Sequence, residues 1–178
     1  KRGLMEQGEV KARPMLGYQI GILTDNSYSK ARIKKINTEV LFQELEKGCI
    51  PVIAGFQGVD REKNITTLGR GGSDTSAVAI AVALKADVCE IYTDVDGIFT
   101  ADPRLVPKAQ LLHQIGFEEM LEFANYGAKM DPRAIELAMT YDIPIVVKSS
   151  TSDSLGTLIS KDTDMKKTIG EIAFACYL

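Results

Sequence analysis

The sequence has 178 residues but only one histidine, three cysteines and no long apolar run. Because His113 is the only histidine, a Ser-His-Asp triad, a Cys-His pair or a multi-histidine metal site would have to include it, and its apolar neighbours favour a packed or surface side chain. Cys49, Cys89 and Cys176 are odd in number and lack CxxC spacing, so neither a zinc site nor a disulfide framework is indicated. The cysteines predict a reducing, cytoplasmic setting. No apolar run reaches the roughly 18 residues of a membrane span.

An excess of basic charge is also absent. Lys plus Arg amount to 21 and Asp plus Glu to 24, which gives a net charge of −3. The chain therefore lacks the positive field expected of a nucleic-acid-binding protein. Hydrophobic residues at 45% and charged residues at 25% are ordinary globular values, which exclude disorder, collagen and coiled coil. We expect a folded domain whose partners are neither nucleic acids nor membranes.

Both ends of the chain look cut through structure. The sequence begins at Lys1, with no initiator Met and no apolar signal segment, and it ends in the apolar run 172–178. The polar stretch 160–167 is a candidate domain boundary. We therefore expect a fragment of a longer protein.

Apolar strand-like runs alternate with helical patterns along the chain. Such alternation predicts an α/β fold with a mainly parallel sheet, arranged as a three-layer α/β/α sandwich. The strands are expected over residues 18–23, 31–36, 50–54, 88–92, 143–147 and 156–159. The helices are expected over residues 38–47, 74–85 and 117–124, and from Pro132 onward.

Residues 66–76 read Thr-Thr-Leu-Gly-Arg-Gly-Gly-Ser-Asp-Thr-Ser and directly precede a predicted helix. The glycines allow close backbone approach to a ligand, and the helix N-terminus offers N–H groups that suit an anion. Arg70 adds a fork that can hold a carboxylate or phosphate with two hydrogen bonds. Asp74 could instead be an ordinary helix N-cap in a tight turn. A position between a strand and a helix of a parallel sheet favours the ligand site.

Polar residues gather again in segment 92–104, just after a predicted buried strand; they are Thr93, Asp94, Asp96 and Asp102. The spacing is similar to the start of an EF-hand, but it lacks the glycine at position six and the glutamate at position twelve, so calcium binding is not expected. We predict no metal site built from protein ligands alone. A capped surface loop remains an open alternative.

A third segment, Asn-Tyr-Gly-Ala-Lys, ends at Lys129 after a predicted helix. This lysine could complement the helix C-terminus or reach a phosphate as a mobile charge. The three segments in this order resemble the aspartokinases, a branch of the amino-acid kinase family. The resemblance runs from about residue 12 to residue 159 and is carried by segments 65–74, 93–104 and 127–129, with further matches at 17–22 and 52–58. The loop 69–74 separates aspartokinases from their relatives, whereas the loop 93–103 also resembles that of bacterial uridylate kinases.

The resemblance implies ATP-dependent phosphorylation, with Mg²⁺, of the side-chain carboxylate of L-aspartate to 4-phospho-L-aspartate, a first step toward lysine, threonine and methionine. It implies that aspartate is bound by Arg70, Gly71, Gly72, Ser73 and Asp74. Asp74 would also organise the catalytic cation. It implies that the nucleotide is bound by Thr93, Asp94, Phe99, Thr100, Ala101, Asp102, Pro103, Arg104 and Lys129. It further suggests a homodimer or larger oligomer in the full-length protein.

The sequence departs from the family pattern in several places. The opening Lys-Phe-Gly-Gly segment and a Ser-x-Gly-Glu segment do not precede the matched region, and Asp131 replaces the usual histidine before Pro132. The resemblance implies a partial catalytic domain over residues 1–160, then a linker and the start of a regulatory ACT-like domain over 161–178. We expect this chain alone to be impaired in turnover. The alternatives are another amino-acid kinase, acting on uridylate or an acylated amino acid, and a non-catalytic nucleotide-binding or dimer-forming module.

Overall fold

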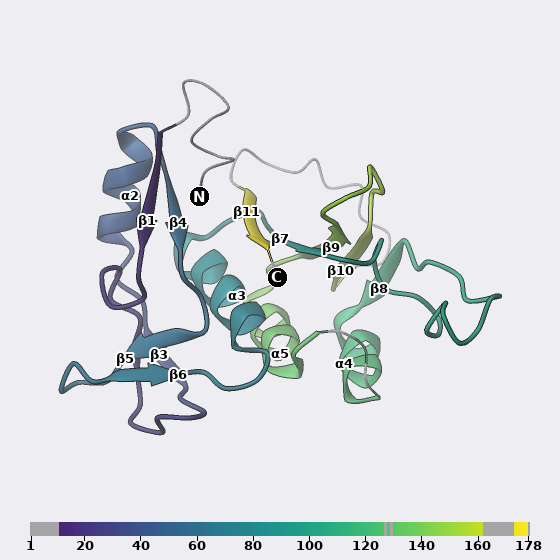
Figure 1. The fold of residues 1–178 in the computed structure, drawn as a ribbon, viewed down its shortest axis with the longest axis horizontal. Helices are drawn as coiled ribbons and strands as arrows, with labels where there is room; N and C mark the ends of the chain where they lie inside the picture. Colours follow the sequence, from purple (N-terminus) through teal and green to yellow (C-terminus); the bar gives the residue numbers. More distant parts are fainter. Residues whose placement is uncertain (1–10, 127, 129, 162–172, 178) are drawn as a thin grey trace. The chain divides into compact units, whose positions relative to one another are not determined.

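The computed structural model describes residues 11–126, 128, 130–161 and, for the backbone alone, 173–177. The chain divides into two compact units, Lys1–Ser76 and Ala77–Leu178 (Figure 1). Strands and helices alternate in both, and most of the described strand pairs are parallel. The predicted α/β class with mainly parallel pairing is therefore confirmed. The division between the units does not test the boundary predicted near residue 160, which stays a prediction.

The first unit contains a parallel pair of strands, β1 (Lys11–Met15) and β4 (Cys49–Ile53). Helix α2 (Glu39–Glu46) packs against β4, as Figure 1 shows. The helix and β4 lie close to where the sequence predicts them. Thr38 occupies the N-cap position without a side-chain cap hydrogen bond, and the preceding Asn37 accepts the Glu39 N–H through its Oδ1 at 3.1 Å.

A second sheet of the first unit has four strands. Their order is β3 (Ile33–Lys35), β2 (Leu23–Thr24), β5 (Gln57–Val59) and β6 (Ile65–Thr67). The inner pair is parallel and the two outer pairs are antiparallel. Strands β5 and β6 fall in segments where the sequence predicts no strand. A short connection joins the two strands, and the glycine-rich segment follows β6 directly.

The strand predicted over residues 18–23 is wrong for most of its length. Residues 17–21 form a turn, in which the Gln19 N–H donates to the Leu16 carbonyl at 2.9 Å. Gly21 has φ +61°, a left-handed conformation that glycine adopts at little cost. The apolar run is buried by this turn, since Ile20 and Ile22 are fully buried. Burial of an apolar run therefore does not require a strand here.

The second unit is built on a five-stranded sheet. The order is β11 (Ala173–Tyr177), β7 (Val88–Thr93), β9 (Ile145–Ser149), β10 (Thr157–Ser160) and β8 (Gln114–Gly116). Only the β9–β10 pair is antiparallel among these described strands. Within the five-stranded sheet, β7 and β9 have their C-terminal ends at the same edge. The long loop after β7 therefore starts beside the residues that follow β9.

One face of the five-stranded sheet packs on α4 (Phe117–Asn125), α5 (Pro132–Tyr141) and the later part of α3 (Gly72–Leu84), as Figure 1 shows. The core between them is apolar and closely packed. It includes Cys89, Ile91, Ile145, Val147 and Ile159 from the strands and Val78, Ala81, Met120 and Ile135 from the helices. Among the described residues, none of the helices is long and apolar enough to cross a membrane.

Candidate functional site

The glycine-rich loop connects β6 to α3 in the first unit. Leu68 anchors its start, because the side chain is fully buried and its N–H donates to the Phe56 carbonyl at 2.9 Å. Gly69 and Gly71 have φ of +79° and +71°, conformations that side chains with a Cβ adopt only with strain. The Gly72 N–H then donates to the Gly69 carbonyl at 2.9 Å. Glycine is therefore required for the backbone course of this loop.

Helix α3 begins at Gly72 and not at Asp74, where the sequence predicts its start. The interpretation of Asp74 as an N-cap is therefore wrong: it lies in the first turn and is 5% exposed. A carboxylate there is stabilised by the positive end of the helix. Arg70 is exposed, two residues before the helix. The loop thus presents an arginine next to a helix N-terminus, a combination that can hold a carboxylate or a phosphate.

Two residues outside the predicted set complete this loop. Ser76 is 1% exposed, and its hydroxyl donates to the Ser73 carbonyl at 2.8 Å and accepts the Phe56 N–H at 3.2 Å. Phe56 has φ +70° although it is not a glycine. The sequence carried no strong signal for either residue, since a serine in a helix is ordinary and the Gly-Phe turn looks like a simple breaker.

The second predicted loop, residues 93–104, leaves β7 in the second unit. The Thr93 hydroxyl donates to Asp94 Oδ1 at 3.1 Å. The Thr93 carbonyl accepts the Ser150 N–H at 2.9 Å and the Ser150 hydroxyl at 3.2 Å. The residues after β7 and β9 are therefore tied together at the same edge of the sheet, which is where parallel α/β sheets bind ligands.

The middle of this loop is held by Thr157, which the sequence analysis missed. Thr157 is fully buried, accepts the Ile98 N–H at 2.8 Å and donates to the Leu112 carbonyl. Gly97 lies so close that a Cβ on it would be 2.5 Å from Thr157 Oγ1. The Asp96 carboxylate accepts the Ser152 hydroxyl at 2.6 Å. Contacts from β10 and from the loop before it thus determine the course of this segment.

The far end of the loop is closed by its own side chains. Arg104 donates to Asp102 from its backbone N–H, its Nε and its Nη2 at 2.9, 3.1 and 2.9 Å. The hydrogen bond to Asp102 raises the pKa of Arg104 above its usual value. Thr100 exchanges hydrogen bonds with Gln110, the two distances being 2.9 and 3.0 Å. The Arg104 side chain is 75% exposed and can turn toward an anion.

The predicted residues therefore fall into two groups. The aspartate-binding set lies in the first unit and the described nucleotide-binding set lies in the second. Lys129 lies outside the described residues. His113 is exposed, so of the two predicted alternatives it is a surface side chain and not a packed one. Among the described residues, no group of three His, Cys, Asp or Glu side chains could hold a metal ion.

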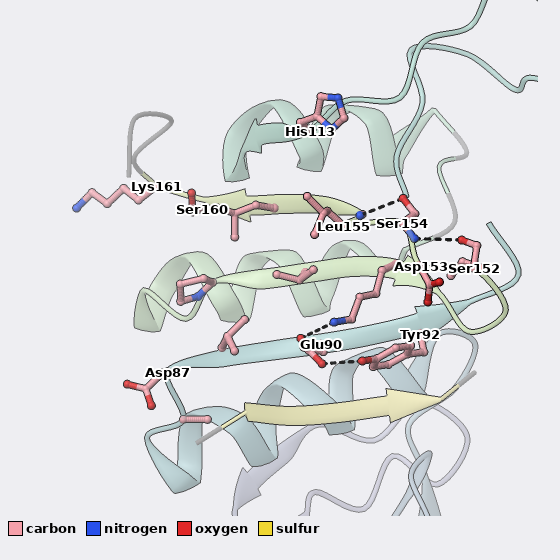
Figure 2. Close-up of a pocket in the computed structure, with 18 of the residues that line it drawn as sticks. Asp87, Glu90, Tyr92, His113, Ser152, Asp153, Ser154, Leu155, Ser160 and Lys161 are labelled. Carbon is pink, nitrogen blue, oxygen red and sulfur yellow. Dashed lines mark hydrogen bonds and ion pairs between the residues drawn. The ribbon is translucent and has the colours of Figure 1, made fainter. Parts of the chain in front are cut away.

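The sheet face of the second unit opposite its helical core holds a concavity of about 940 Å³ (Figure 2). Lys148 Nζ lies 2.7 Å from Glu90 Oε1, the Tyr92 hydroxyl donates to Glu90 Oε2 at 2.9 Å, and the ammonium lies 4.9 Å from the Tyr92 ring centroid. Burial opposes charge on Lys148, but Glu90 outweighs it and the pKa of Lys148 is raised. The positive charge of Lys148 is therefore balanced by Glu90 within this face. None of the predicted site residues lines the concavity.

A family model described as Amino acid kinase family matches residues 3–149. The aspartokinase of Rickettsia prowazekii (strain Madrid E) is 54% identical over 162 residues, covering 89% of this chain and 36% of that protein. Aspartokinase 2 of Bacillus subtilis (strain 168) is 53% identical over 154 residues, covering 86% of this chain and 38% of that protein. The chain spans less than half the length of these curated relatives.

Solved structures of aspartokinases and of a related kinase are also similar to this chain. The structure of E. coli aspartokinase III in complex with aspartate and ADP (R-state) matches with a TM-score of 0.81 and 34% identity, covering 87% of this chain and 36% of that one. UMP kinase from Bacillus anthracis matches with a TM-score of 0.63 and 21% identity, covering 90% of this chain and 63% of that one. At that identity the second likeness shows the fold alone.

Proposed function

This chain belongs to the amino acid kinase family, and we propose that it is part of the catalytic domain of an aspartate kinase. The observation that carries the proposal is the loop 69–74, where Arg70 and the N-terminus of α3 flank a backbone that needs glycine. The relatives named aspartokinase support the same acceptor, since they are more than half identical to this chain over most of its length.

In this proposal the first unit binds the acceptor. Arg70 holds a carboxylate of L-aspartate through two hydrogen bonds. Gly71, Gly72 and Ser73 offer N–H groups at the start of α3, where the helix dipole favours an anion. Asp74, in the first turn of the helix, lies by the reacting phosphoryl group and organises the catalytic cation.

The second unit binds ATP. Thr93 and Asp94, at the carboxyl end of β7, face the usual ligand edge of a parallel sheet. The turn formed by Phe99, Thr100, Ala101, Asp102 and Pro103 shapes the nucleotide pocket, and Arg104 supplies a mobile charge at its rim. Lys129 completes this set.

The proposed reaction transfers the γ-phosphoryl group of ATP to a side-chain carboxylate oxygen of aspartate. The bond between the γ-phosphorus and the bridging oxygen breaks, ADP leaves, and the acyl phosphate 4-phospho-L-aspartate forms. Catalysis of such a transfer consists mainly of positioning and charge neutralisation. Carboxylates such as that of Asp74 are ligands that Mg²⁺ prefers, and the cation would neutralise phosphate charge when bound.

We further propose a cytoplasmic location, a homodimer or larger oligomer in the full-length protein, and a regulatory domain that begins within residues 161–178. The odd number of cysteines, which lack CxxC spacing, supports a reducing compartment. The division of the chain into a partial catalytic domain over 1–160 and this later segment rests on the family resemblance.

The test is acceptor-dependent ADP release by the full-length protein with Mg-ATP. Hydroxylamine in a parallel reaction traps an acyl phosphate as a hydroxamate. We expect turnover and hydroxamate with L-aspartate, and neither with UMP nor with N-acetylglutamate. Turnover with UMP or N-acetylglutamate in place of aspartate would favour another amino-acid kinase. ATP binding without turnover of any acceptor would favour the non-catalytic module.

A further inference from the structure

Phe56 adopts a backbone conformation that is rare for an aromatic residue. Its φ of +70° lies in the left-handed region, where a bulky side chain is a genuine outlier. Outliers of this kind are strained and persist only where surrounding contacts hold them. At Phe56 both backbone polar groups are engaged: the N–H by Ser76 and the carbonyl by Leu68. The turn is therefore held from outside.

Ser76 has two hydrogen bonds, and only one of them is typical of a helical serine. A serine hydroxyl often donates to a carbonyl one turn back, as Ser76 does to Ser73. The Oγ also accepts the Phe56 N–H across 20 residues of chain. Gly55 fits against this hydroxyl, because a Cβ on it would lie 2.7 Å from Ser76 Oγ. One buried oxygen thus joins the turn after β4 to the N-terminal part of α3.

The consequence of this link is the position of the Phe56 ring. A Cβ on Gly72 would lie 3.0 Å from Phe56 Cδ2, so the ring packs directly on the glycine that starts α3. The Phe56 residue is nevertheless 42% exposed. An exposed aromatic ring held against Gly72 borders the same loop that carries Arg70 and Ser73. Its placement depends on a strained backbone and on one hydrogen bond to Ser76.

We propose that Ser76 is a positioning residue that acts through Phe56, keeping its ring as a wall beside the acceptor loop. The inference rests on the proposed aspartate kinase function and adds a determinant of acceptor affinity. Ser76 itself is buried, so we assign it an indirect role. Removal of the hydroxyl releases the Phe56 N–H and lets the turn leave the left-handed region. The ring is then no longer held against the acceptor loop.

The experiment is a double-mutant cycle in the full-length protein, with Ser76→Ala, Phe56→Leu and the double variant. One net hydrogen bond corresponds to about a three- to tenfold change, so we expect Ser76→Ala to raise the KM for aspartate by that factor. The KM for ATP and kcat should change by less than about twofold. In the Phe56→Leu background, Ser76→Ala should add less than about twofold, because coupled residues are non-additive. Ser76→Thr keeps the hydroxyl and should restore much of the affinity.

The control is Thr24→Val, which removes a buried hydroxyl of the same unit that pairs with Thr66 at 2.6 Å. It should lower the melting temperature as Ser76→Ala does, without raising the KM for aspartate. An unchanged KM in Ser76→Ala, or an equal effect of Ser76→Ala with and without Phe56, would overturn the inference alone. Absence of aspartate turnover in the unmodified protein would overturn the proposed function and this inference with it.

Discussion

The two loops that carry the predicted site are built in different ways. Loop 69–74 is determined mainly by its own backbone: Gly69 and Gly71 have positive φ, and the Gly72 N–H donates to the Gly69 carbonyl. Loop 93–104 is determined by side chains that arrive much later in the chain. Ile98 is held by Thr157, 59 residues away, and Asp96 by Ser152, 56 residues away.

This difference explains what each loop reveals in the sequence. A backbone that needs positive φ and close packing requires glycine, so loop 69–74 is visible as a pattern within a few residues. A loop held by distant hydroxyls can be polar and variable in its own sequence. Its anchors are ordinary serines and threonines elsewhere in the chain. The first loop is therefore diagnostic by itself and the second only in context.

The largest expected effect tests whether loop 69–74 binds aspartate and loop 93–104 binds ATP. Arg70→Ala should weaken the binding of aspartate to the full-length protein by about 2–4 kcal/mol, the cost of losing one charge-assisted bidentate contact. The KM for ATP should stay within about twofold. Steady-state kinetics with each substrate varied in turn give both values.

Arg104→Ala is the matched control, because it removes the same side chain from the other loop, where Arg104 is paired with Asp102. It should raise the KM for ATP and leave that for aspartate unchanged. If Arg70→Ala weakened both substrates equally, Arg70 would not belong to the acceptor site and the division of labour between the loops would be lost.

The next largest effect concerns the anchor of the second loop. Thr157→Val leaves the Ile98 N–H and the Leu112 carbonyl without their partner, which should cost about 1–3 kcal/mol of unfolding free energy. Urea unfolding followed by circular dichroism measures this loss. Thr157→Ser retains the hydroxyl and should cost less. A stability unchanged in Thr157→Val, with a clear loss in Thr157→Ser, would show that the Thr157 methyl, and not its hydrogen bonds, stabilises the loop.

The sequence predicted the elements of the second unit better than those of the first. The buried strand β7 and helices α4 and α5 were expected near their observed positions, because their apolar periodicity is clear. Strand β9 starts two residues later than predicted. There, Pro144 belongs to the approach to the strand, and its carbonyl accepts the Cys89 N–H at 2.9 Å.

The short strands β2, β5 and β6 were beyond sequence reasoning because two or three residues give no periodicity. In the same way the loop residues of the site were predicted as a pattern, but their supports were not. Phe56, Ser76 and Thr157 act through hydrogen bonds between residues far apart in the sequence, which only the folded chain brings together. Nothing in a single sequence marks such residues.

A smaller effect should show that glycine is required in loop 69–74 for conformation and for space. Gly69→Ala places a Cβ on a residue with φ +79° and 3.0 Å from the Ser29 carbonyl oxygen. The left-handed conformation alone costs roughly 1–2 kcal/mol, and the contact adds to it. The loop should shift, with a rise in the KM for aspartate and a lower melting temperature.

Gly48→Ala is the control for the conformational part. Gly48 has φ +68°, and nothing lies within 4 Å of the position its Cβ would take. It should lower the melting temperature by the strain alone and leave the KM for aspartate unchanged. If Gly69→Ala behaved like Gly48→Ala in the kinetic assay, the loop would tolerate a side chain and its glycine pattern would not report on the site.

The smallest expected effect is a pH-dependent change in the stability of the first unit, caused by Glu44 and not by loop 69–74. Glu44 is 5% exposed and lies 2.7 Å from Arg13 and 3.1 Å from Lys47. The hydrogen bond from Lys47, followed by the charge of Arg13, outweighs burial and holds the pKa of Glu44 below its ordinary value of 4.5. Since the folded pKa is depressed, the stability from this carboxylate is complete above about pH 4.5 and is lost as pH falls through the folded pKa.

Glu44→Gln should therefore lower the melting temperature modestly at pH 7, and the difference from the unmodified chain should shrink below pH 4.5. Glu46→Gln, an exposed position on the same helix, should change little at either pH. A difference between Glu44→Gln and the unmodified chain that stayed constant from pH 7 to pH 3 would show that shape, and not charge, explains the effect of this side chain.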